Sequence, residues 1–237
     1  MSSPGGIEVD GRAHAGGPGL RGRFRAQVRD EIKQVALRQL ADGGPQALSL
    51  NAVAKVLGVS GPALYRYFAN RDALLTDLVV DAYRDLAAAC EAATAGAWKD
   101  PADRLRALAK AYRAWALEEP HRYRLLFRAP LYGYDAHSEP LVQASQIAMN
   151  VAVEVLEGIA AEGPVAGGEL EAPLAEWAAG RGMPGAAAVI AVRATTLWAR
   201  LHGLVSLEIE GNFASMGLDP TPLYEGEITN LLTTPPA

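Results

Sequence analysis

Two short amphipathic segments with a turn between them, in the stretch from Ala47 to Leu75, constrain the fold more than any other part of the chain. The apolar residues of the first segment recur at helical spacing until Gly58 interrupts the pattern. The second segment begins at Ser60, which can cap a helix, and Leu64 and Phe68 lie one turn apart on its apolar face. Two short helices joined by such a turn are typical of a helix-turn-helix, whose second helix lies in the major groove of DNA.

The residues that follow this turn resemble a known family. Leu64 to Phe68 (LYRYF) and Asn70 to Leu75 (NRDALL) are similar to the recognition helix and the next helix of TetR-like transcriptional regulators. The resemblance extends from about Arg29 to Val80. It implies an all-α protein with an N-terminal three-helix DNA-binding head and a C-terminal helical body that binds a ligand and dimerises. It also implies a ligand-responsive, sequence-specific regulator, most often a repressor that a small-molecule effector releases from its operator.

Charge divides the chain into two parts. Residues 21–71 carry nine Lys or Arg and three acidic side chains, whereas residues 72–237 carry twelve and twenty-two. A basic segment joined to an acidic body fits a segment that meets phosphate, although a solvated basic helix face gives the same counts. We expect a flexible N-terminal arm at 1–20, a helix-turn-helix DNA-binding domain at 21–71, and a helical effector-binding and dimerisation domain at 72–237.

Composition excludes several other classes of protein. The chain has no apolar run near the roughly 18 residues that span a bilayer, and its first residues lack the apolar core of a signal peptide. We therefore expect a cytoplasmic protein with no membrane partner. Its one cysteine, Cys90, can form no intramolecular disulfide, and no other thiol or histidine cluster accompanies it. We expect Cys90 to be a packed helix residue, with a redox sensor as the alternative, and we expect no metal and no cofactor.

The predicted DNA contacts lie on the two short helices and directly after them. Asn51 can pair with adenine, although contacts from Asn to phosphate or water are equally common, and Arg66 can make a bidentate contact to guanine. In the resembled family, Ser49 faces a phosphate, and the hydroxyls of Tyr65 and Tyr67 hold phosphate. The predicted DNA-binding residues are Ser49, Asn51, Ser60, Gly61, Pro62, Ala63, Tyr65, Arg66, Tyr67 and Arg71.

Two further groups of residues extend this predicted interface. Small side chains at 61–63 allow the second helix to approach the DNA closely and to contact a thymine methyl group. Arg71, at the start of the next helix, is a predicted phosphate contact. We also expect basic residues near the N-terminus to reach phosphate or the minor groove beside the main site. They are Arg12, Arg21, Arg23 and Arg25.

The remaining sequence predicts helices and no strands. A long helix from about Arg71 to Ala95 would link the head to the body, and by the resemblance an effector would move it, change the spacing of two heads and release DNA. The resemblance implies a homodimer, and because a dimer reads two half-sites about 34–36 Å apart, we expect a palindromic double-stranded operator. Its interface would include a last helix, about Thr221 to Leu232. Other predicted helices span about Arg23 to Ala41 with Phe24 buried, Asp100 to Glu119, His121 to Phe127, Glu139 to Ala161 with Ile147 buried, Leu174 to Ala179, and Pro184 to Glu210.

Aromatic and histidine side chains of the body can line an effector cavity, although each of them alone is also consistent with a core residue. Trp198 and His202 lie one turn apart and share a face. The stretch from Leu197 to Gly203 also resembles a subgroup of TetR-like regulators that carries a Trp and then His-Gly at this spacing. The predicted pocket residues are Tyr112, Trp115, Phe127, Tyr132, Trp198 and His202.

Two other functions are alternatives to DNA-binding regulation. An all-helical enzyme or carrier needs a nucleophile with its base, a metal cluster or a phosphate-binding Gly loop, and the sequence shows none of these signals, so we predict no catalytic residues. A helix-turn-helix can also bind protein instead of DNA. The basic excess of residues 21–71 and the predicted exposure of Arg66 argue against that alternative.

Overall fold

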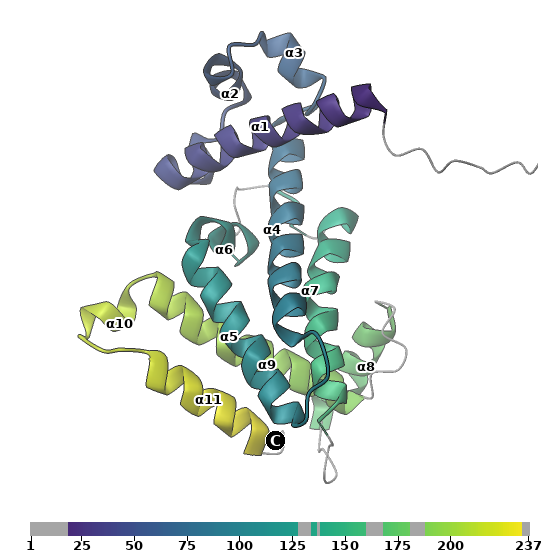
Figure 1. The fold of residues 1–237 in the computed structure, drawn as a ribbon, viewed down its shortest axis with the longest axis vertical. Coiled ribbons are helices and arrows are strands. Elements are labelled where there is room, and N and C mark those ends of the chain that lie inside the picture. The colour runs from purple at the N-terminus through teal and green to yellow at the C-terminus, as the bar shows by residue number, and fades with distance from the viewer. Residues whose placement is uncertain (1–18, 128–133, 137, 160–167, 181–187, 234–237) are drawn as a thin grey trace, which may run out of the picture.

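The computed structural model describes residues 19–127, 134–136, 138–159, 168–180 and 188–233. Every regular element in these ranges is helical, which confirms the predicted all-α class. Helices α1, α2 and α3 form a head at one end of the molecule, and α4 runs from the head into the body (Figure 1). None of the described helices combines the length and the apolarity that a membrane crossing needs.

The head consists of short elements arranged along one longer helix. Polar side chains fix where these elements begin: Ser49 caps α2, Ser60 caps α3, and the Asn70 amide oxygen accepts a 2.8 Å hydrogen bond from the Ala73 amide at the start of α4. Gly58, with φ at +66°, makes the turn between α2 and α3 in a conformation that favours glycine. The elements are α1 (Leu20–Gly43), η1 (Pro45–Ala47), α2 (Leu50–Val56), α3 (Gly61–Tyr65) and α4 (Arg71–Thr94).

An apolar cluster, called here the head core, joins α1 to α3 with the first half of α4. Two body residues, Leu125 and Leu141, complete it, so the head core extends into the body. Its buried members are Ile32, Val35, Ala36, Leu40, Leu48, Leu50, Val53, Ala54, Leu64, Phe68, Leu74, Leu75, Leu78, Val79, Leu125 and Leu141.

The body surrounds the second half of α4. Helix α4 packs against α5, α6 and α7, and α9 packs against α5, α7, α8 and α11. Arg113 of α5 holds three helices together, because its guanidinium donates to both carboxylate oxygens of Glu208 at 2.8 and 2.7 Å and to the Thr221 hydroxyl at 3.1 Å. The elements are α5 (Pro101–Glu118), α6 (Pro120–Phe127), α7 (Glu139–Glu157), η2 (Gly168–Leu170), α8 (Glu171–Gly180), α9 (Ala188–Ile209), α10 (Asn212–Ser215) and α11 (Thr221–Thr233).

The structure corrects several predicted details. Helix α1 begins at Leu20, and the prediction that Phe24 is buried was wrong, because no other helix of the described ranges covers this end and the side chain is 65% exposed. Ile147 is also 40% exposed rather than buried. Helix α7 ends four residues earlier than predicted, α8 is longer, and α10 was not predicted. The predicted arm, except for Gly19 and Leu20, and the predicted start of α9 lie outside the described residues.

Candidate nucleic-acid interface and ligand cavity

Helices α2 and α3 bury one face and expose the other. On α3, Leu64 is 1% exposed and packs into the head core, while Tyr65 is 47% exposed and Arg66 directly after it is also exposed. On α2, the exposed Asn51 lies beside Gly61, where an added Cβ would meet the Asn51 amide oxygen at 3.5 Å. The two helices thus place an amide, a phenol and a guanidinium on the outer surface of the head, and these groups can hydrogen-bond to base edges or phosphates.

The other predicted DNA contacts vary in their exposure. Ser60 and Pro62 are exposed, whereas Ser49, Gly61, Ala63 and Tyr67 are half-buried. The hydroxyls of Ser49 and Ser60 each accept a 3.4 Å hydrogen bond from the backbone amide of the third residue of the helix that follows. These two serines therefore have a structural role as helix caps in addition to any contact with DNA.

Arg71 is engaged inside the protein. It is half-buried, its guanidinium donates to the carbonyl of Pro45, and its Nε is buried without a partner among the described residues. The side chain thereby ties the start of α4 to η1, the turn that precedes α2. Arg71 differs in this respect from Arg66, whose guanidinium forms no hydrogen bond or ion pair within the described part of the chain.

Two basic residues of α1, Arg29 and Lys33, connect this helix to α4. The sequence indicated them only as part of the basic excess of residues 21–71. Arg29 donates to the Asp77 carboxylate at 2.7 Å and to the Tyr67 carbonyl at 2.9 Å, and its guanidinium lies 4.3 Å above the Phe68 ring. Lys33 donates to Asp81 at 2.6 Å. Burial is the largest single influence and lowers the pKa of Lys33, but the hydrogen bonds and charges of Asp81, Asp30 and Asp77 together outweigh it, so the pKa is raised and the ammonium stays charged.

These pairs follow from tertiary structure. Asp77 and Asp81 lie one turn apart on α4 and face residues 48 positions earlier in the chain. The i, i+4 spacing of the two acids, opposite Arg29 and Lys33 at the same spacing, was the sequence signal that could have identified them. The contacts hold the orientation of α1, and with it that of α2 and α3, against the long helix.

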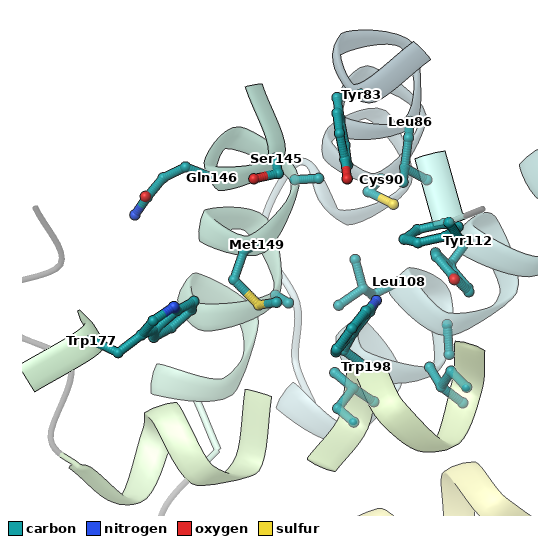
Figure 2. A pocket seen from close by; sticks show the side chains of 16 residues that line it. Tyr83, Leu86, Cys90, Leu108, Tyr112, Ser145, Gln146, Met149, Trp177 and Trp198 are labelled. Carbon is teal, nitrogen blue, oxygen red and sulfur yellow. The ribbon is translucent and has the colours of Figure 1, made fainter. Parts of the chain in front are cut away.

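The body contains a cavity of about 300 Å³, and α4 to α9 all contribute to its wall. Figure 2 shows its side chains arranged around the open space. Of its sixteen lining residues, none is Asp, Glu, Lys, Arg or His. Aromatic rings make up much of the wall, and they are Tyr83, Tyr112, Phe127, Trp177 and Trp198. Such a mainly apolar cavity with a few polar groups is typical of a small-molecule site.

The structure brings together some of the predicted pocket residues. Tyr112, Phe127 and Trp198 line the cavity. Trp115 does not, because it is 6% exposed in the body core and its indole donates to Asp85 at 3.0 Å. Tyr132 lies outside the described residues.

His202 lies behind the cavity wall. Its ring is 5.6 Å from Trp198 and 4.5 Å from Phe127, measured between ring centroids, and both of those residues do line the cavity. Its Nδ1 is 2.8 Å from the hydroxyl of Tyr123, and burial lowers its pKa, which favours the neutral imidazole. His202 therefore supports two lining residues and does not itself line the cavity.

Sequence reasoning missed the contribution of α4 to the cavity. Tyr83, Leu86 and Cys90 line it and recur at i, i+3 and i+7, so they share one face of the helix. That spacing was present in the sequence, but it predicts only a buried face and not a void beside it. Cys90 is 5% exposed and burial raises the pKa of its thiol to about 12, which favours the packed residue over the redox sensor.

Comparison with known proteins supports both parts of this arrangement. Residues 32–78 match the family of bacterial regulatory proteins of the tetR type, and residues 105–231 match the tetracyclin repressor-like C-terminal domain. In the described residues, no three His, Cys, Asp or Glu side chains group closely enough to hold a metal ion.

Individual relatives match this chain over nearly their whole length. The chain is 35% identical over 228 residues to the HTH-type transcriptional regulators Rv1816 of Mycobacterium tuberculosis and Mb1846 of Mycobacterium bovis, covering 90% of this chain and 94% of each relative. The crystal structure of the regulatory protein SCO4313 is 41% identical and superimposes with a TM-score of 0.72 over 90% of this chain and 98% of that one. These matches and the exposed helix-turn-helix confirm the resemblance seen in the sequence: the chain belongs to the TetR family of helix-turn-helix transcriptional regulators.

Proposed function

We propose that this regulator is a homodimeric repressor that releases a palindromic operator when a small molecule occupies the cavity, and that it acts without catalysis. The observation that carries the proposal is the course of α4. Its first half places Leu74 and Leu75 in the head core, and its second half places Tyr83 and Cys90 in the cavity wall. A ligand that displaces the wall of the cavity therefore acts on the same helix that orients the head.

Helix α6 supplies a second connection between the two sites. Leu125 belongs to the head core, and Phe127, two residues later, lines the cavity. A further contact joins α4 to the segment after α6, where the hydroxyls of Thr76 and Tyr134 are 3.0 Å apart. Because both helices reach both sites, a ligand can favour one orientation of the head by favouring one packing of α4 and α6.

The exposed residues of the head fit a division of roles on DNA. In this proposal, Arg66 and Asn51 read base edges in the major groove, while Tyr65, Tyr67 and the helix-capping Ser49 and Ser60 contact phosphates. Gly61, Pro62 and Ala63 allow close approach of α3. Arg71 donates to the Pro45 carbonyl, so it contributes a phosphate contact by using its remaining N–H groups or by giving up the bond to Pro45 on binding.

Dimerisation places two such heads on one operator, and exposed apolar side chains on the C-terminal helices support it. Leu207 of α9 and Leu223 of α11 are 45% and 51% exposed.

We further propose that the chain belongs to the subgroup with Trp198, His202 and Gly203, which is supported by the stacking of the Trp198 and His202 rings. The proposed boundaries remain an arm at 1–20, a head at 21–71 and a body at 72–237.

The test is a selection from random duplex DNA by the purified protein, repeated with Arg66→Ala. Arg106→Ala is the matched control, because Arg106 is a partly exposed cation on α5 that pairs with Asp103 of the same helix. We expect the wild type and the control to enrich one palindrome, and Arg66→Ala to lose preference at one position of each half-site, at a cost of about 1–3 kcal/mol. Weak binding with no enriched sequence, equal for all three proteins, would contradict the proposal.

A further inference from the structure

We infer that the cavity takes an uncharged, largely apolar molecule that carries a hydrogen-bond acceptor, such as an aromatic ketone or ester. The inference deepens the proposed function and rests on it for the regulatory role of the ligand. The binding chemistry itself depends only on the residues of the wall. It names a class of ligand that membership of the TetR family leaves open.

The absence of charge from the wall excludes ionic ligands. None of the sixteen lining side chains is acidic, basic or a histidine. The thiol of Cys90 does not supply a negative charge either, since burial raises its pKa and keeps it protonated. An ionised carboxylate or ammonium that enters such a space loses its hydration and gains no opposite charge, so its binding is strongly disfavoured.

Two donors face the open space. Figure 2 shows the hydroxyl of Tyr83 and the indole nitrogen of Trp198 pointing toward one another from opposite sides of the cavity. Neither group donates a hydrogen bond to another group in the described part of the chain. Burial raises the pKa of Tyr83, so its hydroxyl keeps its proton and can donate it. The ligand therefore needs an acceptor oxygen or nitrogen.

The other polar groups of the wall offer less to a ligand. The Ser145 hydroxyl already donates to the Val142 carbonyl at 2.9 Å, and the Gln146 amide lies 3.5 Å from Asn150. Figure 2 shows the Gln146 side chain directed away from the centre of the space. Polar recognition thus falls to Tyr83 and Trp198 and to the Tyr112 hydroxyl, which is buried in the wall with no hydrogen-bond partner among the described residues. Aromatic and aliphatic side chains make the remaining contacts.

Size and access limit the ligand further. The volume of about 300 Å³ lies at the lower end of the range for small-molecule sites, about 300–1,000 Å³. Trp198 is 42% exposed, so it lies where the cavity meets the surface. A flat molecule of two fused rings with one carbonyl fits these limits, because the rings of Tyr112 and Phe127 offer faces and edges to stack on.

Four naphthalene derivatives of nearly equal size test the inference by equilibrium dialysis against the full-length protein. They are 2-acetylnaphthalene (neutral, with an acceptor), 2-ethylnaphthalene (neutral, without one), 2-naphthoate (anionic) and 2-naphthylmethylammonium (cationic). We expect 2-acetylnaphthalene to bind at least about tenfold more tightly than either ion. Equal or tighter binding of 2-naphthoate or the ammonium, or no measurable binding of the ketone, would overturn the inference.

Variants locate the binding and identify the donors. Tyr83→Phe removes one donor with little change of shape and should weaken binding of the ketone by roughly two- to tenfold while leaving 2-ethylnaphthalene unchanged. Trp198→Phe removes the other donor together with part of the ring, so it should weaken binding of the ketone more than binding of 2-ethylnaphthalene. Ala148→Phe fills the space and should abolish binding of both, whereas Ala114→Phe, at an exposed position of α5, should not. Binding of the ketone that survives Ala148→Phe places it elsewhere. If Ala148→Phe fails to fold, the two donor variants still decide the question.

DNA release separates this inference from the proposed function. The DNA enriched in the selection experiment is titrated with 2-acetylnaphthalene in the presence of the protein. Release of the DNA, lost in Ala148→Phe, supports both statements. Binding of the ketone in the cavity with no release supports the ligand class and contradicts the role of the cavity as the effector site.

Discussion

The head core and the cavity wall are both built from apolar residues on helices, but they differ in how completely they fill the space. In the head core, Leu64, Leu74 and Leu75 are at most 1% exposed. The body core instead borders a cavity of about 300 Å³, and several of its lining residues are only half-buried. A filled core holds one arrangement, because close packing resists change, whereas a hollow one leaves space that a ligand can occupy.

Charge follows the same division. The ion pairs Arg29–Asp77 and Lys33–Asp81 hold α1 of the head against α4, and Arg66 remains exposed on the outer surface of the head. The cavity wall has no charged side chain. The comparison indicates that the part of the chain proposed to meet DNA is built for a fixed shape, and that the part proposed to bind a small molecule is built to adapt. Experiments on both parts of the chain test this contrast.

The largest expected effect is on stability. Leu64→Ala should lower the free energy of unfolding by about 2–5 kcal/mol, because it leaves a void in the filled head core. Met149→Ala enlarges a space that already exists beside a half-buried side chain, so its cost should be clearly smaller. Urea denaturation followed by circular dichroism measures both. Equal losses would remove the distinction between a filled and a hollow core.

The second prediction concerns the thiol at the cavity. The pKa of Cys90 rises from its ordinary value of 9.0 to about 12 on folding, so Ellman's reagent at pH 8 should react at least about a hundredfold more slowly with the folded protein than with the unfolded one. A Cys90→Ala, Ser215→Cys variant carries one exposed thiol as the control. Rapid reaction of the folded wild type would restore the redox-sensor alternative.

The same shift predicts a dependence of stability on pH. The folded pKa lies above the unfolded one, so the contribution of Cys90 to stability is complete below about pH 9 and is lost as the pH rises toward about 12. Cys90→Ala should lose less stability than the wild type over that interval. An identical loss in both proteins would assign the alkaline destabilisation to other groups.

The third prediction tests how far the charged surface of the head extends. Arg21, Arg23 and Arg25 lie exposed near the start of α1, where Phe24 is also exposed. If all three contact phosphate, replacing them with Ala lowers the slope of log affinity against log salt by about 2.7, since each contact contributes about 0.9. Arg106→Ala on the body should leave the slope unchanged. An unchanged slope in the triple variant would confine the DNA contacts to α2, α3 and their flanks.

The smallest expected effect is that of the ion pairs. A double-mutant cycle of Arg29→Met and Asp77→Asn should give a coupling energy of about 0.2–1 kcal/mol, because both side chains are about one-third exposed. The body pair Lys110–Glu225, at 3.4 Å and more exposed, is the matched control and should give a value near zero. A larger coupling energy in the control pair would contradict the view that ion pairs stabilise the orientation of the head more than the packing of the body.

Local patterns in the sequence predicted much of the head. The cap at Ser60, the turn at Gly58 and the buried pair Leu64 and Phe68 were all readable, because each depends on residues within a few positions of one another. The same logic placed the start of α4 at Arg71. Phe24 was wrongly assigned to the core, because helical spacing shows which residues share a face but not where the partner helix ends.

The cavity was predictable only in part. Aromatic composition pointed to Tyr112, Phe127 and Trp198, but the same reasoning included Trp115 and His202, which lie outside the lining. Apolar residues that fill a core and apolar residues that surround a void have the same hydropathy and the same spacing. They differ in the relative position of α4 to α9, which no single helix encodes.

The sequence by itself determined the all-helical class, the helix-turn-helix, its capping residues and the basic character of the head, since local propensity, periodicity and charge are properties of neighbouring residues. Only the tertiary structure decided that Arg29 and Lys33 bind α4, that Arg71 contacts Pro45, and that Tyr83 and Trp198 face one cavity. These contacts join residues 26 to more than 100 positions apart, and such pairings depend on how the helices pack.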